Sequence, residues 1–240
     1  MKSFLFILIL ALSIQATYAQ SDSIRNNQTV KKPFFKHEIV PLSFITVGSL
    51  LNIGNIKHNV EDALPQTHTT IDNYLQYTPM VGMYLFDALG VKHQNSVFDQ
   101  TKYLILTQLT AGVIVYMLKS TTKVQRPLGA PDSFTSFPSG HTTLAFAGAT
   151  VLYHEFKDTD PWVAYSGFVV ATATGYMRLT NRRHWLPDVV TGAGIGILTA
   201  DLVYYLKPLK KLELKSKSGK NKMSFLPAVG YKSFSLACNF

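Results

Sequence analysis

Six apolar stretches fill most of the chain between residues 39 and 206. They lie at about 39–53, 74–90, 101–118, 142–156, 162–177 and 189–206. None of them alternates apolar and polar residues as a half-buried strand does. A helix that spans a membrane needs about 20 residues, and the third, fifth and sixth stretches come close to that length. The pattern predicts an all-α fold, a helical bundle of five or six apolar, mostly transmembrane helices.

The composition supports this fold class. Charged residues are only 15% of the 240, and the mean hydropathy is +0.11. Because soluble domains average about 25% charged residues, a disordered or acidic solvating chain is excluded. The single cysteine, Cys238, excludes an internal disulfide framework and a cysteine-rich zinc site. Small residues in the last two stretches would let helices approach closely in a membrane, and the core of a soluble helical protein is the alternative.

The positive charge is concentrated after the last apolar stretch. The formal net charge is +9, and from Lys207 onward there are eight lysines against one acid, Glu213. A basic segment directly after an apolar helix is typical of a cytoplasmic anchor beside anionic lipid, so we expect the membrane as a partner. No basic face interleaved with aromatic residues accompanies these lysines, and nucleic acid is not expected as a partner.

The N-terminus has the pattern of an export signal. Lys2 is followed by an apolar run over residues 4–14 and by small residues that favour cleavage after Ala19. An uncleaved anchor is the alternative. The chain is therefore expected to consist of a signal peptide at 1–19, a polar segment at 20–38, a helical domain at 39–206 and a basic tail at 207–240. In that tail, residues 223–240 alternate weakly, which predicts either a short strand pair or no regular structure.

The expected membrane topology contains a conflict. If all six stretches cross and the basic tail lies inside, the chain must enter from the inside, whereas a cleaved signal peptide would leave the new N-terminus outside. We favour the interpretation that one of the first two stretches, 39–53 or 74–90, lies along the membrane surface.

Three polar clusters stand where apolar stretches meet loops. They are Lys119 with Arg126-Pro127, then Pro138-Ser139-Gly140-His141, then Arg178 with His184 and Asp188. In an alternating bundle all three emerge on one side, which places the active site at one end. Together they supply three permanent cations, two imidazoles and one carboxylate. That set can bind and cleave a phosphate ester without a metal.

Five residues are expected to bind the phosphate. Lys119, Arg126 and Arg178 match the charge that phosphoryl transfer concentrates on the equatorial oxygens. Ser139 and Gly140 open a helix, where a hydroxyl group and free backbone N–H groups favour anions.

The remaining residues divide the proton chemistry. Asp188, four residues after His184, would fix the tautomer of that ring and leave its other nitrogen free to attack. His141 would then protonate the leaving alcohol. The other histidines have no ligand spacing, so no metal or other cofactor is expected. No role is assigned to Asp132, Ser133 and Ser136, which lie between the first two clusters.

The three clusters resemble the signature of the type 2 phosphatidic acid phosphatase (PAP2) superfamily. The family pattern is Lys-x6-Arg-Pro, then Pro-Ser-Gly-His, then Ser-Arg-x5-His-x3-Asp. The chain matches it at 119–127, 138–141 and 178–188, in the same order and with the same internal spacings. One position departs from it, because Met177 stands where the family has serine, which removes a hydroxyl group but no charge or proton carrier.

The resemblance implies a metal-independent phosphatase that hydrolyses a phosphomonoester or pyrophosphate on a membrane lipid. His184 would form a phosphohistidine, and the substrate would be a phospholipid, a polyprenyl pyrophosphate or a lipid A phosphate. The expected location is the bacterial inner membrane, with several passes and the active site facing the periplasm. The oligomeric state is not predicted.

Three alternatives remain open at this point. The first is a soluble exported acid phosphatase that acts on small phosphate esters. The second is a non-catalytic membrane protein that binds anionic head groups through its basic tail. The third is a haloperoxidase with orthovanadate in the same pocket.

Overall fold

The computed structural model describes residues 38–53, 56–128, 135–206, 224–230 and 233–239. The expected signal peptide and nearly all of the expected polar segment lie outside these residues. The chain divides into two compact units, residues 1–206 and 207–240. Each unit is described by itself.

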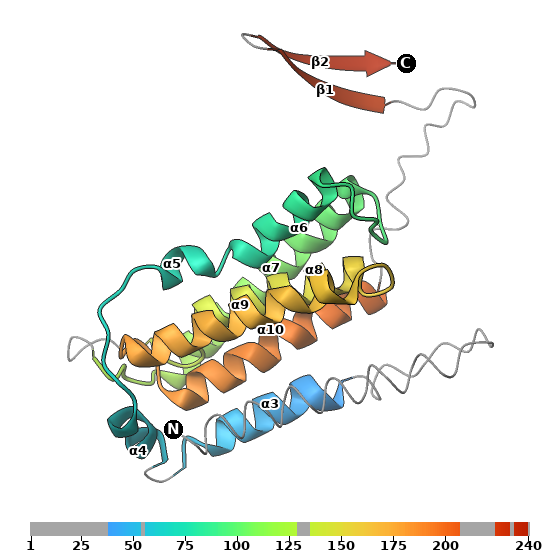
Figure 1. The fold of residues 1–240 in the computed structure, drawn as a ribbon. Helices are drawn as coiled ribbons and strands as arrows, with labels where there is room; N and C mark the ends of the chain where they lie inside the picture. Colours follow the sequence, from blue (N-terminus) through green and yellow to red (C-terminus); the bar gives the residue numbers. More distant parts are fainter. Residues whose placement is uncertain (1–37, 54–55, 129–134, 207–223, 231–232, 240) are drawn as a thin grey trace. The chain divides into compact units, whose positions relative to one another are not determined.

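All regular secondary structure in the described part of the first unit is helical, as the apolar stretches predict. Its helices are α3 (Ile39–Leu50), α4 (Ile56–Ala63), α5 (Asp72–Leu75), α6 (Thr78–Ala88), α7 (Val97–Thr122), α8 (Gly140–Phe156), α9 (Pro161–Thr180) and α10 (Leu186–Leu206). They form a bundle, which confirms the predicted fold class (Figure 1).

The second unit contains an antiparallel strand pair. β1 (Ser224–Gly230) pairs with β2 (Ser233–Asn239), and Ser224 lies opposite Asn239. Of the two expectations for residues 223–240, the strand pair is the one that the structure adopts.

Local sequence signals explain where the helices begin. Ser96 caps α7 by accepting a hydrogen bond from Asp99 N at 3.2 Å, so this helix starts one turn before the predicted stretch. The predicted stretch 74–90 is divided into α5 and α6, because Pro79 is favoured in a first helical turn and opens a new helix there. The short helix α4 was not predicted.

Glycine residues bring the backbones of the central helices together. A Cβ atom added at Gly196 in α10 would lie 2.4 Å from Thr143 O and 2.8 Å from Ala147 N in α8. Only glycine permits such an approach, since those atoms belong to the backbone and cannot move aside. The small residues of α10 therefore hold it close against α8.

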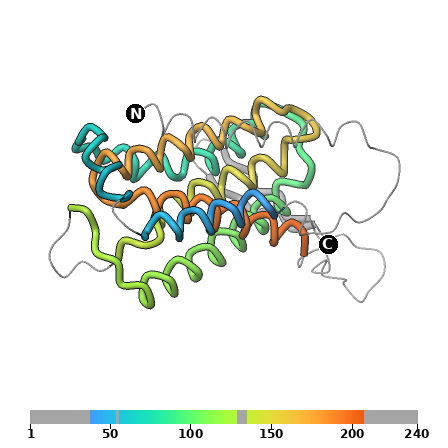
Figure 2. Tube along the Cα trace, turned by 90° about the horizontal axis from the view of Figure 1, so that it is seen from below, coloured from blue at the N-terminus to red at the C-terminus, as the bar shows by residue number. Residues whose placement is uncertain are grey.

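The first two predicted stretches contain helices that pack lengthwise on this bundle. α3 lies antiparallel to α10, with Gly48 beside Thr191 and Gly194 beside Pro41 (Figures 1 and 2). α6 packs along α8, and the ring centroids of Phe86 and Phe156 are 6.0 Å apart. That one of these stretches lies along the membrane surface stays a prediction.

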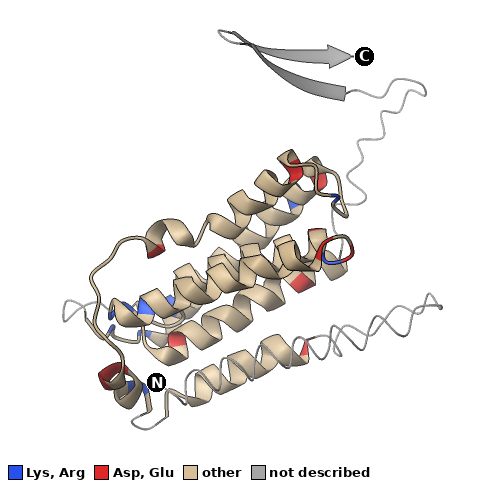
Figure 3. Ribbon diagram, in the orientation of Figure 1, with Lys and Arg blue, Asp and Glu red and all other residues tan. Residues whose placement is uncertain are grey.

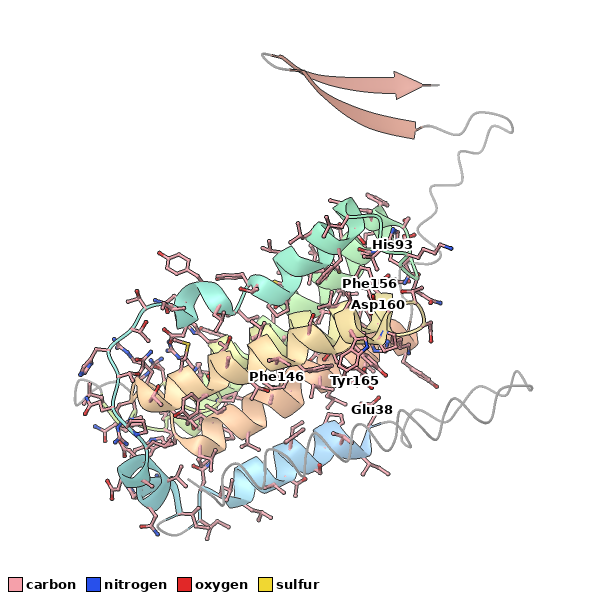
Figure 4. All side chains as sticks on the ribbon, viewed as in Figure 1. Glu38, His93, Phe146, Phe156, Asp160 and Tyr165 are labelled. Atoms are coloured by element: carbon pink, nitrogen blue, oxygen red, sulfur yellow. The ribbon has the colours of Figure 1, made fainter. Side chains whose placement is uncertain are left out.

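The bundle has two ends of different character. α7 and α9 end, and α8 and α10 begin, at what we call the basic end, where lysine and arginine side chains gather (Figure 3). The opposite end, which we call the acidic end, contains Glu38, His93, Phe156 and Asp160 (Figure 4).

A buried carboxylate fixes the helices at the acidic end. Glu155 of α8 is 1% exposed and accepts hydrogen bonds from Asn95 N at 3.0 Å and from Asn95 Nδ2 at 2.9 Å. The hydroxyl group of Tyr204 in α10 donates to the same carboxylate. Because Asn95 directly precedes the cap of α7, this network ties α7, α8 and α10 together.

The close contact at Gly196 predicts a large effect of a side chain there. We expect Gly196→Leu to lower the free energy of unfolding by about 1–3 kcal/mol or more, because the leucine would overpack the α8–α10 contact. Gly112→Leu is the matched control, since a Cβ atom at Gly112 meets nothing within 4 Å. Thermal unfolding in detergent measures both, and equal melting temperatures for the two variants would contradict this packing.

Candidate active site

His184 and Asp188 form a buried pair where α9 gives way to α10. His184 Nδ1 lies 3.3 Å from Asp188 Oδ2, and the two residues are 3% and 0% exposed. Since the carboxylate accepts, Nδ1 of the ring carries the proton. The lone pair of His184 therefore resides on Nε2, the nitrogen that can attack an electrophile.

Asp188 is itself held by its neighbours. Its Oδ2 accepts hydrogen bonds from Trp185 N at 2.9 Å and from the hydroxyl group of Ser136. Its backbone oxygen accepts from Ser139 N at 3.0 Å, which joins the start of α8 to α10. Ser136 Oγ also lies 3.5 Å from His184 Nδ1. Ser136, for which the sequence predicts no role, thus belongs to the hydrogen-bond network of His184 and Asp188.

The surroundings keep His184 neutral. Burial lowers the pKa of His184 to about 4, and the nearby positive charges of Lys119 and Arg178 act in the same direction against the opposing effect of Asp188. At neutral pH the ring is therefore an uncharged base with a free lone pair.

Three cations from different segments surround this pair. Lys119, in the last turn of α7, donates from Nζ to the backbone oxygens of Ser136, at 3.1 Å, and of Thr135. Arg126 follows α7, and burial together with the charges of Arg178 and Arg183 lowers the pKa of its guanidinium group. Such close positive charges repel one another, and an anion between them would relieve that repulsion.

The two predicted arginines also keep unused donors. Within the described residues, the buried Nε atoms of Arg126 and Arg178 have no hydrogen-bond partner. Buried N–H groups without a partner are rare in folded proteins and need an explanation. A phosphate group bound between the arginines would supply the missing acceptors.

The start of α8 is built as a capped helix. The Ser139 hydroxyl group accepts from Thr142 N at 3.4 Å and lies 2.9 Å from Thr142 Oγ1. This hydroxyl group serves the cap, so its contact with a phosphate remains a prediction. A Cβ atom at Gly140 would meet only Val115, at an ordinary 3.6 Å, so packing within the protein does not require glycine here.

α5 supplies partners for two of the predicted site residues. Asp72, 1% exposed, forms an ion pair with Arg178 through Arg178 Nη1. The next residue, Asn73, places Oδ1 at 3.0 Å from Nε2 of His141. This short helix thus joins the predicted phosphate ligand of α9 to the predicted acid of α8.

A small pocket opens beside His184 on the other side of the site. It is lined by side chains of α4, of the end of α9 and of residues 184–186, among them Lys57, Val60, Leu64, Leu179 and Trp185. Arg182 holds α4 in place by donating from Nη2 to Leu64 O at 3.1 Å. Among the described residues, no group of three or more histidine, cysteine, aspartate or glutamate side chains is arranged to hold a metal ion.

A sequence model of the PAP2 superfamily matches residues 100–211, a range that contains all three motif clusters. This region of the chain belongs to the PAP2 superfamily. The superfamily pattern thus covers α7 to α10, the helices whose ends and connections carry Lys119, Arg126, Arg178 and His184.

Curated PAP2 relatives share part of their length with this chain. Lipid A 1-phosphatase of Porphyromonas gingivalis is 36% identical over 172 residues, which are 69% of this chain and 38% of that protein. An undecaprenyl-diphosphatase of Sulfolobus acidocaldarius is 25% identical over 133 residues, or 49% of this chain and 63% of that protein. The chain spans less than two thirds of the length of either relative.

Two solved structures are also similar. LpxE of Aquifex aeolicus has a TM-score of 0.44 and 27% identity, covering 59% of this chain and 88% of that one. The first transmembrane PAP2 type phosphatidylglycerolphosphate phosphatase from Bacillus subtilis has a TM-score of 0.42 and 20% identity. That match covers 88% of this chain and 96% of the other.

The contacts that sequence reasoning missed lie outside the PAP2 motifs. Asp72 and Asn73 precede the matched range 100–211, and Ser136 lies between two motif clusters. The one signal for α5 was an acid and an amide directly before an apolar stretch, in a chain with only 14 acidic residues.

The burial of His184 predicts its titration. In NMR spectra of the protein with labelled histidine rings, the His184 signal should not move between pH 8 and about pH 5.5. The reason is that an ordinary histidine titrates near 6.5 and this one near 4. His184→Gln assigns the signal by removing it. A midpoint near pH 6.5 would show that the ring is not buried beside these cations.

Proposed function

We propose that the chain is a metal-independent phosphatase that hydrolyses a phosphomonoester or pyrophosphate on a membrane lipid through a phosphohistidine on His184. Membership of the PAP2 superfamily and the phosphatase relatives support the reaction class. The single observation that carries the proposal is the position of the buried, neutral His184 beside Lys119, Arg126 and Arg178, two of which keep buried N–H groups without a partner among the described residues.

The proposed roles follow the charges of the site. Lys119, Arg126 and Arg178 would bind the equatorial oxygens and stabilise the negative charge of the transition state, a task that divalent ions perform in many other phosphoryl-transfer enzymes. Ser139 and Gly140 would offer the N-terminus of α8 to the same group. Since Lys119 and Arg178 are fixed by helix ends, they need little reorganisation during the reaction.

Two histidines would carry the bond changes. His184 Nε2 attacks phosphorus, the bond from phosphorus to the lipid oxygen breaks, and His141 gives its proton to that oxygen. Water then attacks the phosphohistidine and gives a proton to His141. The P–N bond breaks, inorganic phosphate leaves, and both histidines return to their starting state.

Exposed apolar side chains support a location in the membrane. α7 and α10 are long and apolar enough to span a bilayer by length and composition. On α7 an apolar stripe faces outward along Ile105, Leu109, Val113 and Met117, each more than half exposed. Exposed apolar area of this extent needs a partner, and lipid tails are the partner that a phosphatase for lipids would meet.

The direction of the helices supports a periplasmic site. α7 to α10 run between the two ends of the bundle, and α10 leaves the basic end toward the acidic end. The lysines that follow α10 in the sequence would then stay in the cytoplasm, and the basic end would face the periplasm of a bacterial inner membrane.

The substrate is proposed as a class. The curated relatives include a lipid A 1-phosphatase and an undecaprenyl-diphosphatase, so lipid A phosphates and polyprenyl pyrophosphates are the first candidates. Phosphatidate and phosphatidylglycerol phosphate complete the panel, because the cations recognise the phosphate group that all four share.

Release of inorganic phosphate in detergent from these four lipid classes tests the proposal. We expect activity on at least one of them, unchanged by EDTA and lowered at least about 1,000-fold in His184→Ala, since the nucleophile is lost. His68→Ala, at an exposed histidine, is the matched control and should keep full activity.

Three results would overturn the proposal in different ways. Loss of activity with EDTA would reject the metal-free mechanism, and full activity of His184→Ala would reject the nucleophile. Faster hydrolysis of small water-soluble esters than of any lipid would favour a soluble exported phosphatase.

A further inference from the structure

α5 brings two consecutive polar side chains to the site. Asp72 pairs with Arg178 of α9, and Asn73 hydrogen-bonds to His141 of α8 through Oδ1 and Nε2 at 3.0 Å. Both lie outside the range that matches the PAP2 superfamily. The ion pair involves Arg178, a proposed phosphate ligand, and the hydrogen bond involves His141, the proposed general acid.

The support under Asn73 is rigid. Asp72 and the side chain of Arg178 are nearly inaccessible, at 2% and 7% side-chain exposure, so their ion pair anchors α5 to α9. Gln76 Nε2 donates to Asn73 O at 2.8 Å, which closes this short helix. Ahead of α5, Asn181 at the end of α9 donates from Nδ2 to Thr69 O at 2.9 Å. The backbone that carries Asn73 is therefore held on both sides of this residue.

The chemistry of an amide oxygen decides the tautomer of His141. Asn73 Oδ1 carries no proton, so the hydrogen bond requires that Nε2 of His141 carries one. The neutral ring then has its lone pair on Nδ1. Only Nδ1 can gain and release a proton without breaking the bond to Asn73.

We propose that Asn73 is a positioning residue that fixes the tautomer and orientation of His141, so that Nδ1 is the atom that exchanges protons during phosphate hydrolysis. The proposal rests on the proposed function. In the first step the proton moves from Nδ1 of the imidazolium to the leaving oxygen as its bond to phosphorus breaks. In the second step the attacking water returns a proton to Nδ1.

The charges around His141 explain why an amide suits this position. The positive charges of Lys119 in α7, Arg126 in the following loop and Arg178 in α9 act on the ring. Among the described residues, Asp72 acts on it as a negative charge. A neutral acceptor supports the imidazolium without cancelling the cations that bind phosphate. A carboxylate at this position would support the imidazolium more strongly and would repel the substrate phosphate.

The experiment compares three variants of the full chain in detergent. Asn73→Ala removes the acceptor, Asn73→Asp keeps an oxygen at the same reach and adds a charge, and Tyr74→Ala changes a neighbour in α5 that is 76% exposed. The turnover number kcat and the Michaelis constant KM are measured from pH 5 to 9 on a lipid phosphate that the wild type hydrolyses. Thermal unfolding shows that each variant is folded.

We expect Asn73→Ala to lower kcat about tenfold with little change in KM, less than the roughly 100-fold or more that loss of a general acid costs. Asn73→Asp should recover most of kcat, raise KM and move the basic limb of the kcat profile up by about one pH unit, because the added charge stabilises the imidazolium. Tyr74→Ala should match the wild type. A wild-type profile for Asn73→Ala, an equal loss in Tyr74→Ala, or an unmoved basic limb in Asn73→Asp would each overturn the proposal.

A measurement without substrate separates this proposal from the proposed function. In ¹⁵N spectra of labelled histidine, His141 should be the Nε2–H tautomer in the wild type and a mixture of tautomers in Asn73→Ala. The same tautomer in both proteins would overturn the role of Asn73 even if the enzyme is active. The expected change in an inactive wild type would uphold the contact and reject the phosphatase instead.

Discussion

Repulsion among positive charges at one end of a helical bundle is the constraint on which the site depends. Arg126 and Arg178 are partly or fully withdrawn from water, face each other and keep buried N–H groups without partners in the described structure. A folded protein accepts such a cost when a ligand relieves it, and a phosphate group has the charge and the acceptors to do so. Burial keeps His184 neutral and the charges of Lys119 and Arg178 act in the same direction, so the nucleophile stays uncharged beside the residues that bind phosphate.

The rest of the fold keeps these cations together. Helix ends carry Lys119 and Arg178, so the positions of α7 and α9 decide where the charges lie. Backbone contact at Gly196 locks α10 to α8, and the network around Glu155 ties the same helices at the acidic end. The contacts that stabilise the acidic end of the bundle therefore also help to keep the cations in position at the basic end.

The sequence predicted those parts that depend on local pattern. The apolar stretches located most of the helices, and the three polar clusters do converge at one end because alternating helices return their ends to the same side. Contacts that depend on tertiary packing were not predictable. Nothing in the spacing of residues 119 to 188 connects them to Asn73 or assigns Ser136 to Asp188. The lengthwise packing of α3 on α10 through glycines was not predicted either.

An experimental structure with orthovanadate bound tests the central claim most directly, because this anion mimics the phosphorus centre during transfer. The account predicts vanadium bonded to Nε2 of His184, with its oxygens contacted by Lys119, Arg126 and Arg178 and with no metal ion between them. Vanadate bound away from His184, or held through a divalent ion, would contradict the account.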